Sequence, residues 1–407
     1  MPPVVPRVVF APTATALTLA FVAGGIGLGT CSGLVPGLHV NNLALLLAAV
    51  APSVPGPPRL VGAAMLAAGT VHTFLDVVPA LALGVPDAAM AATALPGHQL
   101  VLAGRGREAL RLSALGSGLA VALALPLAVP VTAAMRTLYP ALRAHLPLLL
   151  AGVAAFLVLT DRSRVGAAVC VAASAGLGLA TLDRPVSGPL PTGDVLAPLF
   201  AGLFGAPVLL DALGGGGVPE QDDAVVAQRP AAVALTAGAG TLAGAAVGYL
   251  PGVSSAVASL VALLAAPDGG PRSFVVATSG ANTATSVFAL FALVAFRTPR
   301  TGVLVAFEAA HLPLNLPLLL ASVVLAGAVG AVLVPTLGDR YLRTVGRADY
   351  TRVSVAVLAL LVALSYGFAG PFGVAVLGGA TLVGLLPARV GARRVTLMGV
   401  LLGPLAL

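Results

Sequence analysis

The sequence predicts an all-α integral membrane protein with about ten to fourteen membrane segments. Composition is the first observation behind this fold class: 58% of the 407 residues are hydrophobic and 9% are charged, whereas a soluble domain carries about 25% charged residues. The second is a series of long charge-free runs, many near the roughly 20 apolar residues that a spanning helix needs. The third is a glycine-proline motif, present once in each half, which predicts two repeats with broken helices.

The charge-free runs follow one another along the chain, separated by short connections. The first covers residues 8–58, and its opening part is too long and too weakly flanked for a cleavable signal peptide. We therefore predict a true span there. The later runs cover residues 60–75, 112–135, 165–182, 195–210, 230–267, 273–296, 309–338 and 353–388.

The basic residues are all arginines, and the net charge is +7. Most of them lie in short connections, which usually mark the cytoplasmic side of a membrane protein. This arrangement explains the positive charge without a nucleic-acid partner, which would need a solvated basic surface. The predicted location is the cell membrane, crossed many times.

The sequence carries no pattern typical of an enzyme. Cys31 and Cys170 lie in apolar segments, so no disulfide framework is indicated. The histidines lack metal-ligand spacing, and no nucleotide-binding or Ser-His-Asp motif is present. We predict no cofactor and no metal, apart from Na⁺ or H⁺ as a coupling ion.

A polar stretch divides the chain near its middle. Residues 214–230, "GGGGVPEQDDAVVAQRP", are typical of a solvated linker. It separates an N-terminal transmembrane repeat (1–213) from a C-terminal one (231–407). The segment "GIGLGTCSGLVPGL" of the first half aligns without gaps on "GTLAGAAVGYLPGV" of the second. The shared residues are Gly25, Gly29, Gly33, Pro36 and Gly37, and Gly240, Gly244, Gly248, Pro251 and Gly252. The complete pattern favours duplication, and by analogy with membrane carriers an inverted one.

The motif has a physical interpretation. Glycines four residues apart leave a groove in which a second helix packs closely. Proline removes an amide donor and ends the helix, near Val35 in one copy and Leu250 in the other. The next pieces, residues 37–51 and 252–266, hold about 15 residues, or about 22 Å of helix. They are too short to cross the roughly 30 Å hydrocarbon core, which predicts half-helices or re-entrant hairpins.

Broken helices expose backbone N–H groups at membrane depth, where they are tolerated only around a protein-lined cavity. Helix N-termini bind anions, and two of them near the midplane are a recurrent transporter design. We therefore predict an anion site. Its residues are the backbone donors of Gly37, Leu38, His39, Gly252, Val253 and Ser254, with the side chains of His39, Asn41, Asn42 and Ser255.

An uncharged polar island, "TSGANTATS", extends from Thr278 to Ser286. Ser279, Asn282 and Thr283 fall on one helix face with Ser286. This stripe favours contact with substrate or Na⁺. The alternative is that small hydroxyl residues serve helix packing.

Two groups of ionisable residues are candidates for ion coupling, because charged residues inside a membrane are usually functional. His72 and Asp76 share a helix face, and the alternative is a neutralised structural pair. Glu308 and His311 share another face of a helix that Pro313 interrupts, which predicts a buried carboxylate at Glu308. The alternative places Glu308 at the membrane interface near arginines.

Both repeated motifs and residues 74–113, which begin "FLDVVPALALGVPDAAMAATALPGHQ", resemble the TctA family. TctA is the large permease subunit of tripartite tricarboxylate transporters, and the chain is similar to its shorter prokaryotic relatives. The resemblance implies an ion-driven carrier that takes up carboxylates. It also implies two partners, a small membrane subunit and an extracytoplasmic solute-binding protein.

The function expected from these features is secondary transport of an organic anion, a di- or tricarboxylate, coupled to Na⁺ or H⁺. An alternative is translocation of a polyprenyl phosphate, since the Pro251–Ser254 sequence also resembles a motif of those lipid carriers. A second alternative is a membrane scaffold that transports nothing.

Overall fold

The computed structural model of the chain describes residues 11–36, 38–84, 94–190, 195–211, 213, 218–223, 225–250, 255–264, 270–345, 347 and 349–406. In these ranges the regular structure is entirely helical. By length and composition, eight helices are able to cross a membrane, and four shorter apolar helices accompany them. The predicted all-α membrane fold is confirmed.

Long helices are interspersed with short ones along the chain. The long ones are α1 (Pro12–Gly33), α3 (Pro58–Leu75) continued by α4 (Val77–Leu83), α6 (Gly106–Ala144), α8 (Arg164–Thr181), α11 (Pro230–Tyr249), α13 (Pro271–Phe296), α15 (Leu316–Val345) and α16 (Tyr350–Gly384). The shorter ones are α2 (Val40–Val50), α5 (Ala94–Leu102), α7 (Leu146–Leu159), α9 (Leu196–Phe200), α10 (Ala206–Asp211), α12 (Ser255–Leu264), α14 (Gly302–Ala309), α17 (Leu386–Val390) and α18 (Gly399–Ala406). Short helical turns of other pitch are η1 (Ala51–Ser53), η2 (Ala201–Gly205) and η3 (Arg394–Met398).

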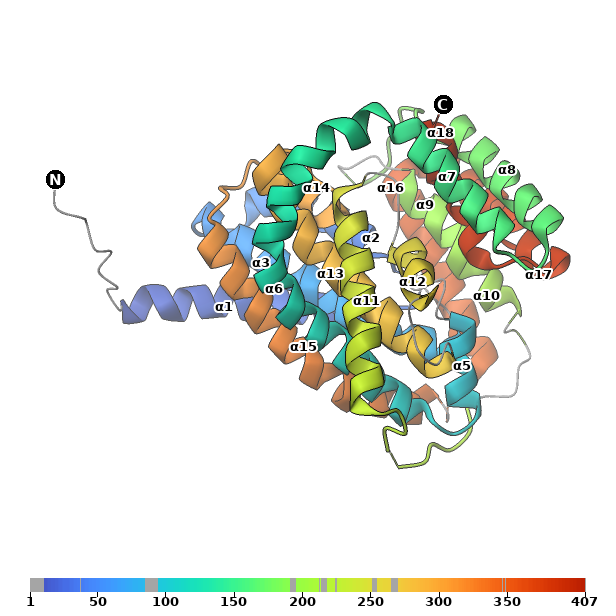
Figure 1. Cartoon of the computed structure of the whole chain (residues 1–407), viewed down its shortest axis with the longest axis horizontal. Coiled ribbons are helices and arrows are strands. Elements are labelled where there is room, and N and C mark those ends of the chain that lie inside the picture. The colour runs from blue at the N-terminus through green and yellow to red at the C-terminus, as the bar shows by residue number, and fades with distance from the viewer. Residues whose placement is uncertain are drawn as a thin grey trace.

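Helix α13 lies at the centre of the molecule and packs against α6 and α11 (Figure 1). Ser279 on α13 shares a 2.8 Å hydrogen bond with Ser113 on α6, and its carbonyl oxygen accepts from Ser117 Oγ at 3.1 Å. Helices α7, α8 and α18 pack together on the side where the chain ends (Figure 1). The central helix of the second half is thus bonded directly to a helix of the first.

Both copies of the motif interrupt a helix. Helix α1 ends at Gly33 and α2 begins at Val40, whereas α11 ends at Tyr249 and α12 is described from Ser255. Helices α2 and α12 have 11 and 10 residues, or about 15 Å of helix each. This is half of the roughly 30 Å hydrocarbon core, so the described part of neither helix is long enough to cross a bilayer alone.

The motif glycines of the first half pack against the backbone of α3. Gly25 and Gly29 lie against Ala64 and Ala68, and Gly33 lies against the turn at His72. At these positions there is no room for a Cβ atom, so the two helices meet backbone to backbone. This is the close approach that glycines four residues apart allow.

The second half repeats this packing between α11 and α13. Gly240 lies against Ala277 and Gly244 against Ala281, and a Cβ atom at these glycines would lie 2.7 Å and 2.6 Å from the carbonyl oxygens of those alanines. Ala64 and Ala277 are 213 residues apart, as are Ala68 and Ala281. The likeness agrees with a duplication, although the duplication, its inversion and the domain division stay predictions.

The polar segment between the halves is attached to the first half. Its described part lacks helix, as expected of a linker, but Gln221 Oε1 accepts from the Gly106 N–H at 2.7 Å and Gln221 Nε2 donates to the Val101 carbonyl oxygen at 3.1 Å. The Asp222 N–H donates to the Gly104 carbonyl oxygen at 2.8 Å. These bonds attach Gln221 and Asp222 to the first half, although most described residues of the segment are exposed, and the division of the chain at this segment stays a prediction.

One buried carboxylate joins this segment to both halves. Glu108, in the first turn of α6, accepts two hydrogen bonds from Arg272 of α13, at 2.7 and 3.1 Å. It also pairs with Arg105 at 2.7 Å and accepts from the Ala227 N–H at 2.9 Å. The Glu108 side chain is 2% exposed. Such charge-assisted bonds are about twice as strong as neutral ones.

We expect Glu108→Gln to lower the free energy of unfolding by about 3 kcal/mol, because it leaves two arginines facing an uncharged partner in a buried site. Thermal unfolding of the purified protein in detergent, followed by circular dichroism, measures the change. The exposed Glu220 of the same polar segment provides the matched control, and Glu220→Gln is expected to stay within about 0.5 kcal/mol. Equal stability of the two variants would contradict the assigned role of Glu108.

Candidate functional site

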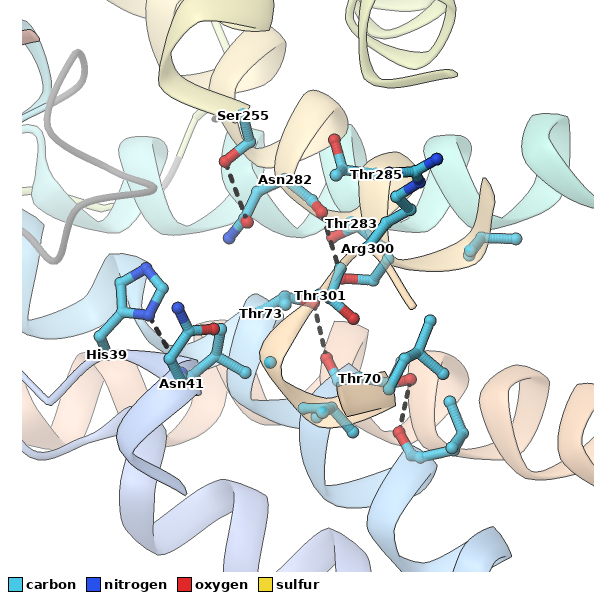
Figure 2. A pocket seen from close by; sticks show the side chains of 18 of the residues that line it. His39, Asn41, Thr70, Thr73, Ser255, Asn282, Thr283, Thr285, Arg300 and Thr301 are labelled. Atoms are coloured by element: carbon cyan, nitrogen blue, oxygen red, sulfur yellow. Dashed lines mark hydrogen bonds between the residues drawn. The ribbon is translucent and has the colours of Figure 1, made fainter. Parts of the chain in front are cut away.

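A cavity of about 170 Å³ is lined by residues at the start of α2 and by Ser255 at the start of α12 (Figure 2). We call it the polar cavity. Residues of both halves line it, contributed by α2 and its N-cap, α3, α9, α12, α13, α14 and the connection that leads into it, α15, η3 and α18. They are His39, Val40, Asn41, Leu66, Gly69, Thr70, Thr73, Phe200, Ser255, Asn282, Thr283, Thr285, Ser286, Val287, Arg300, Thr301, Gly302, Val303, Leu304, Val323, Met398 and Leu401.

The first half presents His39 and Asn41 at the start of α2. His39 is the N-cap residue, with extended backbone, and its Nδ1 accepts from the Asn41 N–H at 3.0 Å. Its ring lies 5.3 Å from the ring of Phe200, centroid to centroid. The side chain of His39 thus accepts a hydrogen bond from one of the backbone N–H groups that lack a partner at a helix N-terminus. Helix α2 begins four residues after Pro36 and not at it, which differs from the expected helix start.

The predicted backbone donors of this break are corrected in part. The Leu38 N–H donates to the Val35 carbonyl oxygen at 3.3 Å, and Leu38 does not line the polar cavity. Asn42 is buried but is not a lining residue either. Gly37 lies outside the described residues. In the described residues the first half therefore offers the cavity the side chains of His39 and Asn41, and not the expected amide of Leu38.

The second half presents Ser255 at the start of α12 and the polar stripe of α13. Ser255 Oγ donates to Asn282 Oδ1 at 3.3 Å (Figure 2), and both side chains are buried. Thr283 also lines the cavity, and its Oγ1 is buried with no hydrogen-bond partner among the described residues. The remaining predicted residues of this break, Pro251, Gly252, Val253 and Ser254, lie outside the described residues.

Hydroxyl groups face the cavity from equivalent positions of α3 and α13. Thr70 and Thr73 lie on α3, and Thr283 and Ser286 lie on α13. Thr70 and Thr283 are 213 residues apart, and so are Thr73 and Ser286. This is also the separation of the packed alanines. Asn282 takes the place that Gly69 holds on α3. The cavity is thus lined by matching faces of the two halves, with one amide added.

Arg300 supplies the positive charge, and sequence reasoning missed it. It is the one arginine among the described lining residues. One Nη donates to the Tyr139 hydroxyl, and the guanidinium carbon lies 5.3 Å from the centroid of the Tyr139 ring. The Arg300 Nε is buried and has no hydrogen-bond partner among the described residues. An unsatisfied buried donor of this kind is costly unless a ligand or water accepts from it.

The two intramembrane groups His72 and Asp76 are both buried, and each is bonded to another helix. His72 Nδ1 lies 2.9 Å from Ser32 Oγ of α1. Asp76 Oδ2 accepts from Asn282 Nδ2 at 2.8 Å. A carboxylate of the first half is therefore one hydrogen bond away from a residue that lines the cavity.

Three other candidates lie elsewhere. Ser279 bonds to α6, as the packing alternative expects. Glu308 and His311 are exposed, so the expectation of a buried carboxylate there is wrong. Helix α14 ends at Ala309, and His311 adopts a left-handed backbone, φ 51°, so these two residues do not continue one helical face.

The polar cavity can hold an anion that carries carboxylate and hydroxyl oxygens. A guanidinium binds a carboxylate through parallel N–H donors, and hydroxyl and amide side chains add neutral hydrogen bonds. In the part of the chain that the structure describes, no group of three or more His, Cys, Asp or Glu side chains is arranged to hold a metal ion.

Comparisons with known proteins found a matching family model and a relative. A family model described as "Tripartite tricarboxylate transporter TctA family" matches residues 19–399. An uncharacterized protein of Methanocaldococcus jannaschii is 25% identical over 404 residues, which cover 95% of this chain and 98% of that protein. No solved structure matches significantly.

Proposed function

Because this chain belongs to the tripartite tricarboxylate transporter TctA family, we propose that it is the permease that moves a di- or tricarboxylate across the membrane, coupled to Na⁺ or H⁺. The family is one of transporters, so the chain is an integral membrane permease and not an enzyme. The proposal concerns the substrate, the coupling ion and the site.

The polar cavity supports an anionic substrate. Arg300 places a permanent positive charge in it, and its buried Nε–H donor has no acceptor among the described residues. Secondary carriers bind their substrates between repeats, at discontinuous helices, and this cavity is lined by the ends of α2 and α12. The guanidinium with its open donor is the observation that carries the proposal.

Asp76 supports coupling to a cation. A buried carboxylate bonded to Asn282 of the other half takes up H⁺ or Na⁺ more readily when an anion approaches. Members of the family work with a small membrane subunit and a solute-binding protein. We propose the same two kinds of partner for this chain.

Uptake by the purified protein in liposomes tests the proposed function. The panel contains mono-, di- and tricarboxylates and a lipid phosphate, each with and without a Na⁺ or pH gradient. Accumulation of a di- or tricarboxylate that requires one of the gradients is the expected result. Movement of the lipid phosphate alone, or of nothing in the panel, would overturn it.

We expect Tyr139→Phe to weaken carboxylate binding about 3- to 10-fold, the effect of one lost hydrogen bond of about 0.5–1.5 kcal/mol. The phenyl ring keeps the cation–π contact, but the hydroxyl that orients Arg300 is lost. Equilibrium binding of a radiolabelled carboxylate measures the change. Tyr366 is exposed on α16, so Tyr366→Phe is the matched control and should bind as the wild type does.

A further inference from the structure

We propose that Asn282 transmits the charge state of Asp76 to the polar cavity by turning its side-chain amide. This inference rests on the proposed function and adds to it the mechanism by which a bound cation raises the affinity for the anion. The ligand of Asp76 is a proton or Na⁺, and the shared chemistry is neutralisation of its carboxylate.

Three buried side chains from three elements form a chain of hydrogen bonds. Ser255 Oγ donates to Asn282 Oδ1 at 3.3 Å, and Asn282 Nδ2 donates to Asp76 Oδ2 at 2.8 Å. The three residues are 5%, 6% and 4% exposed. Ser255 and Asn282 also line the polar cavity. In this series of hydrogen bonds each donor points toward Asp76. An ionised carboxylate requires this direction, because it can only accept.

Neutralising Asp76 reverses this requirement. A protonated Asp76 carries an O–H that donates to the nearest acceptor, and a Na⁺ ion bound there takes oxygen ligands. Either one favours Asn282 Oδ1 on the side of Asp76. The amide then turns, and its NH₂ group donates toward Ser255, which becomes an acceptor.

This rotation of the Asn282 amide makes the Ser255 O–H available as a donor in the cavity. Once Ser255 Oγ accepts from Asn282, its own O–H is free to donate to an anion in the polar cavity. At the same time a negative charge next to the cavity has been neutralised. Both changes favour the anion, so cation binding and anion binding support each other, as thermodynamic linkage requires.

The helix of Asp76 and the elements packed against it carry other titratable and charged groups. His72 precedes it by one turn on α3 and contacts Ser32, His98 of α5 contacts the Leu81 carbonyl oxygen at 2.6 Å, and His39 lies at the cavity. On the elements packed against α3 and α4, the remaining charged residues stand near helix ends: Arg107, Glu108, Arg111, Arg136 and Arg143 of α6, Arg272 of α13, Glu308 of α14 and Asp339, Arg340 and Arg343 of α15. A pH effect that disappears in Asp76→Asn is therefore assigned to Asp76 and not to a histidine.

Two measurements on the purified protein test the inference. Carboxylate affinity is titrated against Na⁺ at fixed pH with K⁺ as replacement, and against pH without Na⁺. Thermal stability without carboxylate follows cation binding by itself. In the wild type, one of the two cations should raise the affinity about 10-fold and also raise Tm.

Three variants separate the roles. Asp76→Asn should bind carboxylate with an affinity that no longer depends on the cation, and its Tm should not respond. Asn282→Ala should keep the Tm response but lose most of the cation dependence of carboxylate affinity, to within about 3-fold. Thr278→Val, on α13 but outside the cavity, should behave as the wild type does.

The outcomes distinguish the inference from the proposed function. If the wild type binds no carboxylate under any condition, the proposed function fails. If it binds one with an affinity that neither Na⁺ nor pH changes, or if Asn282→Ala keeps the full cation dependence, the inference alone is overturned.

Discussion

Replacing Arg300 with Gln should lower carboxylate uptake and affinity at least about 100-fold, or roughly 2.7 kcal/mol. Losing one partner of a close charge pair in a site shielded from water costs about 2–5 kcal/mol. Gln keeps some hydrogen-bonding capacity but neither the charge nor the guanidinium that binds a carboxylate through two parallel donors. Arg300→Lys keeps the charge and should recover only part of the loss.

The same connection offers the control. Arg297 is exposed and stands three residues earlier, so Arg297→Gln changes the net charge equally without touching the polar cavity. Uptake and equilibrium binding in liposomes, corrected for the amount of inserted protein, compare the variants. If the Arg300→Gln variant transports as well as the Arg297→Gln variant does, Arg300 does not bind the anion.

Replacing Gly244 with Ala should destabilise the protein by about 2 kcal/mol, because extra atoms in a tightly packed contact force helices apart. The added Cβ would lie 2.6 Å from the Ala281 carbonyl oxygen and 2.9 Å from the Ala284 side chain. Gly29→Ala should act alike at the contact of α1 with Ala68. Thermal unfolding in detergent measures both changes.

Glycines of the same helices that do not pack against a neighbour provide the control substitutions. No atom lies within 4 Å of a Cβ placed at Gly238 of α11 or at Gly27 of α1. Alanine there should be neutral or stabilise by up to about 1 kcal/mol, because glycine is a poor helix former. The two sets of substitutions should therefore differ in sign. Destabilisation by Gly238→Ala as large as by Gly244→Ala would show that the close contact is not the cause.

The helix breaks could be predicted because their causes are local. Proline lacks an amide donor, and glycines four residues apart share one helix face, so the sequence alone indicates both the interruption and the packed surface. The polar stripe of α13 could be found in the same way. Asn282 and Thr283 of that stripe line the cavity, whereas Ser279, one turn earlier, faces α6.

The cationic residue could not be predicted, because its place depends on a tertiary arrangement. Arg300 stands in a short connection rich in arginine and proline, a pattern typical of a solvent-exposed loop. Only the packing of Tyr139, near the far end of α6, directs its guanidinium to the cavity. The capping of α2 by His39 was missed for a related reason, since a histidine ring is an uncommon N-cap.

The contacts of Glu108, and those of Ser279 with Ser113 and Ser117, affect how much the architecture depends on the peptide between the halves. Side chains of α6 and α13 bond the halves to each other, and the connecting peptide adds hydrogen bonds of Gln221, Asp222 and Ala227 to the first half. We therefore expect the halves to associate through α6 and α13 even as two separate polypeptides, provided that Gln221, Asp222 and Ala227 remain attached to one of them.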